Sequence, residues 1–156
     1  MSKLTSIDYA NIINWIAYNK FGVLLNKTQM QKILFISYGV YLANYGTKLF
    51  EDDTPKAWPF GPVFPRVNKH FNPGIPKSIN EDLKQSIIKN ENAVRTIIPV
   101  VEKYHKYSAK TLSEWSHQQG GPWSQTVYGD NAEKREIQWN LPIEDDKIKT
   151  FFRKAK

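Results

Sequence analysis

The chain has 156 residues, a length at which a single core buries about 70% of the surface that the unfolded chain exposes, so we expect one domain over residues 1–156. It contains no cysteine, which excludes disulfides, zinc–thiolate sites, iron–sulfur clusters and thiol nucleophiles. The formal net charge of +7 favours an acidic protein or a nucleic acid as partner, and 13% aromatic residues supply enough apolar bulk to exclude disorder as the default state.

The N-terminal segment predicts an amphipathic helix. Thr5 or Ser6 can cap it, and Asp8 lies in its first turn, where the helix dipole favours a negative charge. The apolar residues that follow fall on one face at helical spacing: Tyr9, Ile12, Ile13, Ile16 and Ala17. We expect this helix to end between Lys20 and Gly22.

A second, longer helix is predicted from the segment Thr28-Gln-Met-Gln31, which matches a capping box. Its apolar residues form one stripe and then spread around the rest of the helix, as a helix contacted on several sides requires. They are Met30, Ile33, Leu34, Phe35, Ile36, Tyr38, Val40, Tyr41, Leu42 and Tyr45. We therefore expect this helix to be central and to end at Gly46.

A proline-rich segment, Pro55 to Pro65, cannot form the interior of a helix, because proline lacks the amide donor and restricts the residue before it. We expect it to be extended and to turn at Gly61. Residues 63–71 then predict a short helix with Pro65 in its first turn, followed by a second break at residues 72–76.

Helical spacing returns from about Asn80 in two successive pieces. We expect Pro99 to kink the second piece or to lie near its start. Ser108 begins a short helix that runs to His117. The last predicted helix opens at Pro142 and buries three apolar residues: Ile148, Phe151 and Phe152. The predicted fold is mainly α, a compact single-domain helical bundle with a small extended or β element around residues 55–64.

The segment Glu114 to Trp123 is the most conspicuous candidate for a chemical site. Ser113 and Ser116 flank His117, but on a helix the Ser116 side chain points away from it, and no nucleophile-elbow pattern is present. We interpret the segment as a helix end, with His117 in the last turn, where the dipole favours a proton on the imidazole. Gly120 then caps the helix, Pro122 blocks its continuation and Trp123 covers its end.

Metal and phosphate sites are not expected either. His70, His105 and His117 are far apart in sequence and lack the spacing that places two ligands on one helical face. Gly120-Gly121 precedes Pro122 rather than the lysine of a phosphate-binding loop. We predict a protein without metal, cofactor or catalytic residues.

Neither a membrane nor a nucleic acid is the favoured partner. Lys and Arg occur mostly singly along the chain, and their densest run, Arg153 to Lys156, is a tail, so the charge is typical of a solvated surface. The chain does not begin with a basic segment followed by an apolar run, and no stretch approaches the roughly 18 apolar residues of a membrane span. We expect a cytoplasmic protein.

Three blocks of residues together resemble the Panacea domain, the SocA-like antitoxin family that also occurs in phage-associated proteins called GepA. The blocks are Gln31-Lys-Ile-Leu-Phe, Ala57-Trp-Pro-Phe-Gly-Pro-Val-Phe-Pro65, and Leu112-Ser-Glu-Trp-Ser-His117 followed by Pro122-Trp123. The resemblance covers roughly residues 7–128. It implies a compact, mainly α, non-enzymatic domain that neutralises a protein toxin by direct binding and, in one branch, delivers the toxin to a protease as an adaptor. The alternatives are a phage-encoded protein that binds a host protein, or a nucleic-acid-binding module on the same scaffold.

The resemblance also implies which residues matter. Family-motif positions expected to act as scaffold are Lys32, His117, Pro122 and Trp123. Residues expected to bind the partner are Trp58, Phe60, Gly61, Pro62, Val63, Phe64 and Arg66, with Trp58 and Gly61 also supporting the scaffold. A proline-stiffened segment presents side chains with little loss of entropy on binding, so we expect Phe60 and Phe64 to be exposed contacts and Arg66 to meet an acidic partner.

Overall fold

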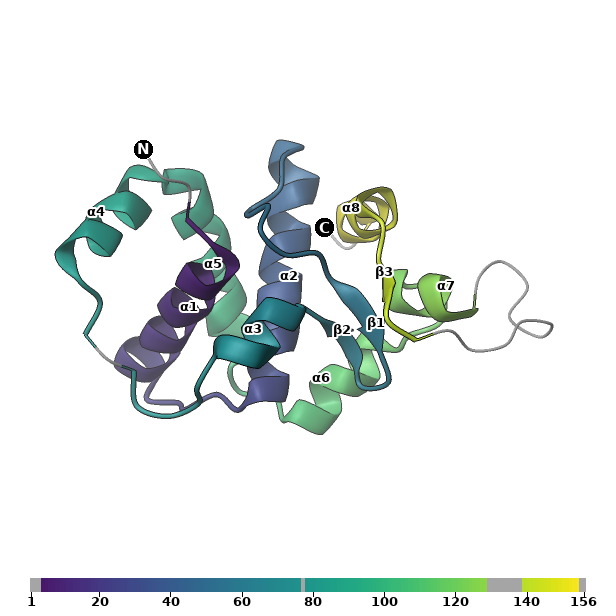
Figure 1. Cartoon of the computed structure of the whole chain (residues 1–156), viewed down its shortest axis with the longest axis horizontal. Coiled ribbons are helices and arrows are strands. Elements are labelled where there is room, and N and C mark those ends of the chain that lie inside the picture. Colours follow the sequence, from purple (N-terminus) through teal and green to yellow (C-terminus); the bar gives the residue numbers. More distant parts are fainter. Residues whose placement is uncertain (1–3, 77, 129–138, 155–156) are drawn as a thin grey trace.

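The computed structural model describes residues 4–76, 78–128 and 139–154, and this part of the chain is mainly α-helical (Figure 1). Its helices are α1 (Ser6–Phe21), α2 (Lys27–Tyr45), α3 (Pro65–His70), α4 (Glu81–Lys89), α5 (Glu91–Tyr104), α6 (Ala109–Ser116), α7 (Pro122–Tyr128) and α8 (Asp145–Lys154). Its strands are β1 (Lys56–Trp58), β2 (Gly61–Val63) and β3 (Leu141–Pro142). The predicted class, a compact and mainly α fold with a small β element, is confirmed.

Capping contacts define where α1 and α2 begin. At α1 the Thr5 hydroxyl accepts from the Asp8 amide at 3.2 Å, and the Thr5 amide donates to the Asp8 carboxylate at 2.9 Å, which confirms the predicted start. At α2 the same pair of bonds joins Asn26 and Gln29, at 2.8 and 2.9 Å. The predicted capping box at Thr28 is therefore wrong by two residues, because asparagine caps a helix at least as well as threonine.

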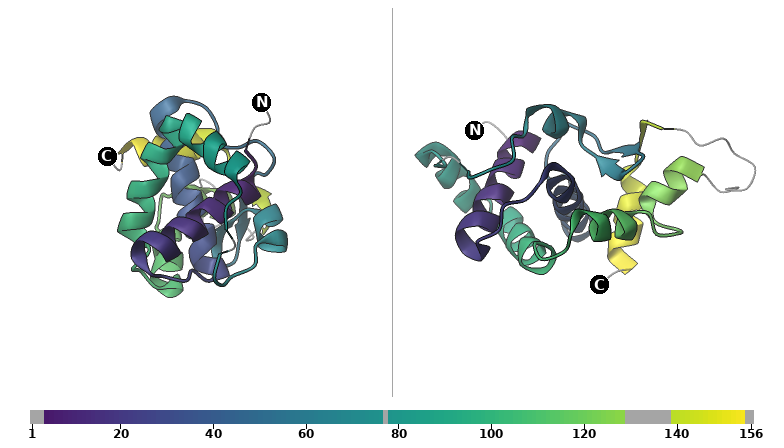
Figure 2. Two further views of the ribbon diagram at one scale, coloured as in Figure 1. Left: turned by 90° about the vertical axis from the view of Figure 1, so that its left-hand side faces the viewer. Right: turned by 90° about the horizontal axis from the view of Figure 1, so that it is seen from below.

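The helix α2 lies at the centre of the fold, as its apolar surface predicted. Every residue from Met30 to Gly39 is buried. α2 packs against α1 and α5 on one side and against α8 on the other (Figure 2). A Cβ atom at position 39 would overlap the ring of Phe152. The absence of a side chain at Gly39 therefore allows α8 to pack closely against α2. The helix ends at Gly46, which adopts the left-handed conformation as expected.

The small sheet is built around β1. β1 and β2 form an antiparallel hairpin with Pro59 and Phe60 between them, and Ala57 lies opposite Pro62. On its other edge β1 pairs with β3, which gives the strand order β2-β1-β3. The sequence pattern placed Pro142 at the start of the last helix, but this residue ends β3 and α8 begins beyond it.

The later helices follow the predicted spacing, with differences at their ends. Pro65 is in the first turn of α3, as expected, and Pro99 lies inside α5. His117 forms the C-cap of α6, so Gly120 turns the chain before α7, with a φ of 82°, instead of capping α6. Pro122 begins α7 rather than only ending α6, because a proline fits the first position of a helix.

Candidate functional site

Two polar residues of α2 hold the hairpin against the core. Gln31 and Lys32 are only 3% and 1% exposed. The Gln31 amide nitrogen donates to the Phe64 carbonyl at 3.1 Å, and its amide oxygen accepts from the Phe64 backbone amide at 2.7 Å. The Lys32 ammonium group donates to the Pro62 carbonyl at 3.0 Å. Because a buried polar group without a partner is destabilising, these bonds fix the position of β2 on α2.

The hairpin approaches both α2 and α6 closely at Gly61. The φ of Gly61 is 117°, a conformation that other residues rarely adopt. A Cβ atom there would lie 2.7 Å from Cε of Lys32 and would overlap the Ser116 hydroxyl. That hydroxyl donates to the Ser113 carbonyl at 2.8 Å, which holds it in place. A glycine is therefore required at position 61, because the backbone has a positive φ there and because Lys32 and Ser116 leave no space for a side chain.

Burial changes the protonation of Lys32, whose pKa it lowers to about 8. In the unfolded chain a lysine has a pKa near 10.4. Between about pH 8 and that value the unfolded state binds a proton that the folded state has released, so the folded state gains stability as the pH rises. Below about pH 8 both states carry the proton and this group adds no further pH dependence.

We expect the free energy of unfolding to rise between about pH 8 and pH 10, by up to about 1.4 kcal/mol per pH unit, and we expect Lys32→Met to lack this rise. Near pH 10 the trend should reverse, because burial raises the pKa of Tyr9 to about 12 and also raises that of Tyr38, so tyrosines ionise first in the unfolded chain. Urea unfolding at a series of pH values measures both effects. An equal rise in Lys32→Met would assign the effect to another group.

A second group of residues, from α6 and α7, closes over β1. The rings of His117 and Trp123 lie 4.0 Å apart between centroids. Trp123 is buried, and its indole nitrogen donates to the Trp58 carbonyl at 2.7 Å. Pro122 is buried at the start of α7. The structure thus brings the predicted scaffold residues, including Lys32 from α2, together around the hairpin.

The protonation expected for His117 is wrong in direction. The helix dipole predicted a favoured proton, but burial lowers the pKa of His117, and the nearby Lys32 ammonium lowers it further. A hydrogen bond with the backbone of Pro59 opposes these two effects. The Nε2 atom of His117 is buried and has no hydrogen-bond partner among the described residues. The imidazole therefore packs on Trp123 in its neutral form at pH 7.

The residues predicted to bind a partner differ widely in exposure. Phe60, in the hairpin turn, exposes 73% of its surface, and the side chain of Arg66 exposes 57%. Trp58 is half-buried, and its indole nitrogen donates to the Asn140 side chain at 2.9 Å. The buried members of the set are Gly61, Pro62, Val63 and Phe64. Arg66 has a local partner, since its guanidinium lies 3.5 Å from the Asp52 carboxylate.

The prediction that Phe64 is an exposed contact is wrong. Phe64 is 0% exposed, and its ring centroid lies 5.4 Å from that of Tyr38 and 5.1 Å from that of Phe50. The two bonds with Gln31 hold the Phe64 backbone against α2, and the ring faces the core. Phe64 anchors the end of the hairpin and does not extend its surface.

Three residues that contact the hairpin or its neighbours were missed from the sequence. Gln31 was assigned to a helix cap, although its position beside Lys32 inside an apolar stretch was a signal that both are buried. Trp139 is 45% exposed, and its ring centroid lies 6.2 Å from that of Trp123. The side-chain oxygen of Asn140 accepts from the Trp58 indole nitrogen. These last two residues depend on the pairing of β3 with β1, for which the local sequence carries no signal.

Other kinds of site find no support in the described part of the chain. The Ser116 hydroxyl is bonded to the Ser113 carbonyl. The ring of His105 stacks on that of Phe21, with 4.5 Å between their centroids, whereas the ring of His117 packs at a tilt against that of Trp123. Within residues 4–76, 78–128 and 139–154, no group of three His, Asp or Glu side chains could hold a metal ion. Over the same residues, no helix combines the length and apolar character needed to cross a bilayer.

Residues 30–124 match the family described as antitoxin SocA-like, Panacea domain. The chain belongs to this family. Antitoxin SocA from Caulobacter vibrioides (strain NA1000 / CB15N) is 29% identical over 140 residues, which cover 83% of this chain and 72% of that protein. No solved structure matches the chain.

The part that matches the Panacea family contains both groups of contacts around the hairpin. It begins inside α2, just before Gln31, and ends just after Trp123 in α7. Three elements that contact it lie outside the match: α1, β3 and α8. The residues predicted from the sequence to be family-motif positions therefore take part in the hydrogen bonds that hold the hairpin, and most of them are buried.

Proposed function

We propose that the protein is a non-enzymatic antitoxin that neutralises a protein toxin by binding it directly, with the hairpin tip as a contact. The Panacea family match and the antitoxin relative support this function. The structural observation that carries the proposal is Phe60, which is 73% exposed in the turn of a hairpin whose base is held by three buried side chains. These are Gln31, Lys32 and Trp123.

A fixed and exposed aromatic side chain suits a protein contact for two physical reasons. Its apolar surface is available to be buried by a partner, and aromatic residues are enriched among the side chains that dominate binding energy. Its backbone is already ordered, so little conformational entropy is lost on binding. Trp139 is a second exposed aromatic side chain, and its neighbour Asn140 is bonded to Trp58 of the hairpin.

We expect Phe60→Ser to weaken toxin binding at least about tenfold while leaving the melting temperature nearly unchanged, since exposed substitutions stay within about 0.5 kcal/mol of neutral. The assay pairs this protein with the product of the gene beside its own and measures calorimetric affinity and growth rescue. Ile88→Ser is the matched control, because Ile88 is likewise a large, mostly exposed apolar residue, at 62%, but lies on α4. Normal neutralisation by Phe60→Ser would remove the hairpin tip from the interface.

The net charge of +7 supports a second candidate, a nucleic-acid-binding module. Binding through phosphate contacts weakens steeply with salt. Gel shifts with duplex and single-stranded DNA at about 50 and 200 mM salt separate the two functions. Micromolar binding with a steep salt slope, together with a neighbouring gene product that is neither toxic nor retained, would favour nucleic acid over a toxin.

A further inference from the structure

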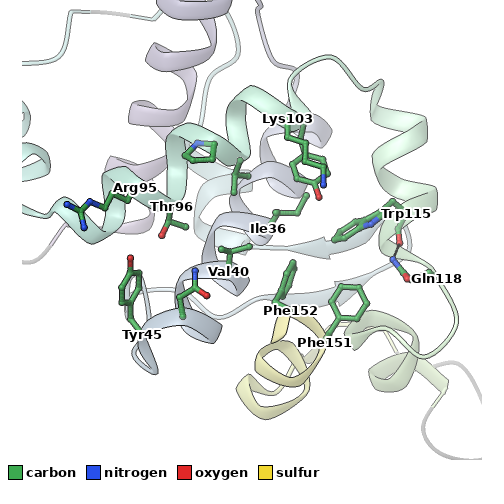
Figure 3. A pocket seen from close by; sticks show the side chains of 14 residues that line it. Ile36, Val40, Tyr45, Arg95, Thr96, Lys103, Trp115, Gln118, Phe151 and Phe152 are labelled. Atoms are coloured by element: carbon green, nitrogen blue, oxygen red, sulfur yellow. Dashed lines mark hydrogen bonds between the residues drawn. The ribbon is translucent and has the colours of Figure 1, made fainter. Parts of the chain in front are cut away.

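We propose that a groove between α5 and α8 binds an acidic, amphipathic helix of a protein partner. The groove is a cavity of about 750 Å³ on α2 (Figure 3). Ile36 and Val40 of α2 lie between its two walls, and Trp115 of α6 lies at one end beside Phe151 of α8. This inference rests on the proposed function in one respect, which is that the partner is a protein.

The shape of the groove fits a helix better than a compact small molecule. The α5 wall presents Arg95, Pro99 and Lys103, and the first and last of these are eight residues apart, or about 12 Å along the helix axis. Ile36 and Val40 line the middle of the groove. Thr96 and Tyr45 lie near Arg95, and the rings of Trp115 and Phe151 lie at the opposite end. A helix that lays its apolar face into a groove uses anchors spaced over about two turns, which matches this length.

The charge of the groove selects the chemistry of the occupant. Arg95 and Lys103 line it, and no Asp or Glu is among the described residues that do so. Arg95 is paired with Glu91 at 3.6 Å, but both side chains are more than 70% exposed, and a pair of this kind contributes little. Lys103 lies over the ring of Tyr104 at 5.3 Å and has no acidic neighbour in the groove lining. An occupant with carboxylates on the edge of its apolar face would satisfy both cations.

The proline inside α5 adds a feature that a partner can recognise. Pro99 has no backbone N–H, so the carbonyl of Arg95 lacks the donor that a regular helix supplies. Pro99 is exposed and lines the groove. The groove thus offers an apolar surface and two cations, and one wall is a helix that contains a proline.

The two walls of the groove have different relations to the Panacea family. α5, α6 and most of α2 lie within the matched residues 30–124, whereas α8 lies outside them. On α8, Phe152 is buried against Gly39 and fixes the helix, while Phe151 is only partly buried and packs edge-on to Trp115 at 5.9 Å. Phe151 is therefore the α8 residue most able to contact an occupant. The choice of partner would depend on a wall that the family match does not include.

The test selects peptides on the full chain without any toxin. A displayed library of helical peptides of about 14 residues, or four turns, is enriched on the protein, and the recovered peptides are titrated by fluorescence polarisation. We expect acidic, amphipathic sequences whose affinity falls at least tenfold in Arg95→Glu/Lys103→Glu and in Phe151→Ala. Affinity should be unchanged in Phe60→Ser and in Lys20→Glu/Lys69→Glu, which makes the same change of net charge at exposed positions outside the groove.

Three results would overturn the proposal. They are a selection without acidic amphipathic peptides, an equal loss of affinity in the Lys20→Glu/Lys69→Glu control, and DNA binding that depends on Arg95 and Lys103 with no peptide binding. Thermal melting of each variant shows that it is folded. Neutralisation of a toxin by the parent protein is measured in a separate assay. The results can therefore show that the groove binds no peptide although the protein is an antitoxin, or that the groove binds peptides although the protein neutralises no toxin.

Discussion

Replacement of Phe64 by alanine is expected to lower the free energy of unfolding by about 3–5 kcal/mol, the typical effect of truncating a buried phenylalanine. Phe64 is 0% exposed and lies between the rings of Tyr38 and Phe50. The substitution removes these contacts and leaves a cavity at the junction of the hairpin and α2. Urea unfolding followed by circular dichroism measures the change.

Phe60→Ala is the matched control for this prediction, because the two phenylalanines stand four residues apart on the same hairpin. Phe60 is 73% exposed, so its truncation should change stability by no more than about 0.5 kcal/mol. The pair separates the side chain that holds the hairpin from the one that the hairpin presents. If both variants lost stability equally, the assigned exposure of Phe60 would be incorrect.

Gly61→Ala should be destabilising by about 2–6 kcal/mol. Backbone strain at its φ of 117° accounts for about 1–3 kcal/mol. The added methyl group also meets Lys32 and Ser116, and overpacking of this kind costs about 1–3 kcal/mol. Lys32 is buried and bonded to Pro62, so it cannot move aside without losing that bond.

Gly74→Ala isolates the backbone part of this effect. Gly74 has a φ of 129°, but a Cβ atom there would have nothing within 4 Å. We therefore expect Gly74→Ala to be destabilising by about 1–3 kcal/mol, from strain alone. Thermal and urea unfolding of both variants give the difference, which measures the close approach of the hairpin to α2. Equal losses in the two variants would show that the hairpin has room to shift.

Local sequence signals predicted the helices well and the hairpin only in part. Apolar spacing identified α2 as central, and Thr5 with Asp8 predicted the start of α1, because these signals act over one or two turns. The position of β3 and the burial of Phe64 depend on contacts between segments far apart in the chain. No pattern within residues 55–65 distinguishes a phenylalanine that faces α2 from one that faces solvent.

The candidate site shows the same division. The motif blocks identified the residues around the hairpin, and Lys32 is among them. Their roles came only from the structure, since the sequence assigned Gln31 to a helix cap and Lys32 to the scaffold without showing their bonds to Phe64 and Pro62. The protonation of His117 was predicted from the helix dipole, but partial burial and the nearby Lys32 lower its pKa.

The docking of α8 through Gly39 bears on how pieces of this chain are chosen for expression. A fragment trimmed to residues 30–124, the limits by which the family is recognised, would lack both α1 and α8. The face of α2 that α8 covers carries Phe35 and Gly39, which contact Phe152 and would then be exposed to water. The residues that match the family model are thus fewer than the residues needed to bury α2. A fragment cut at the limits of the match is therefore poorly suited to biochemical work.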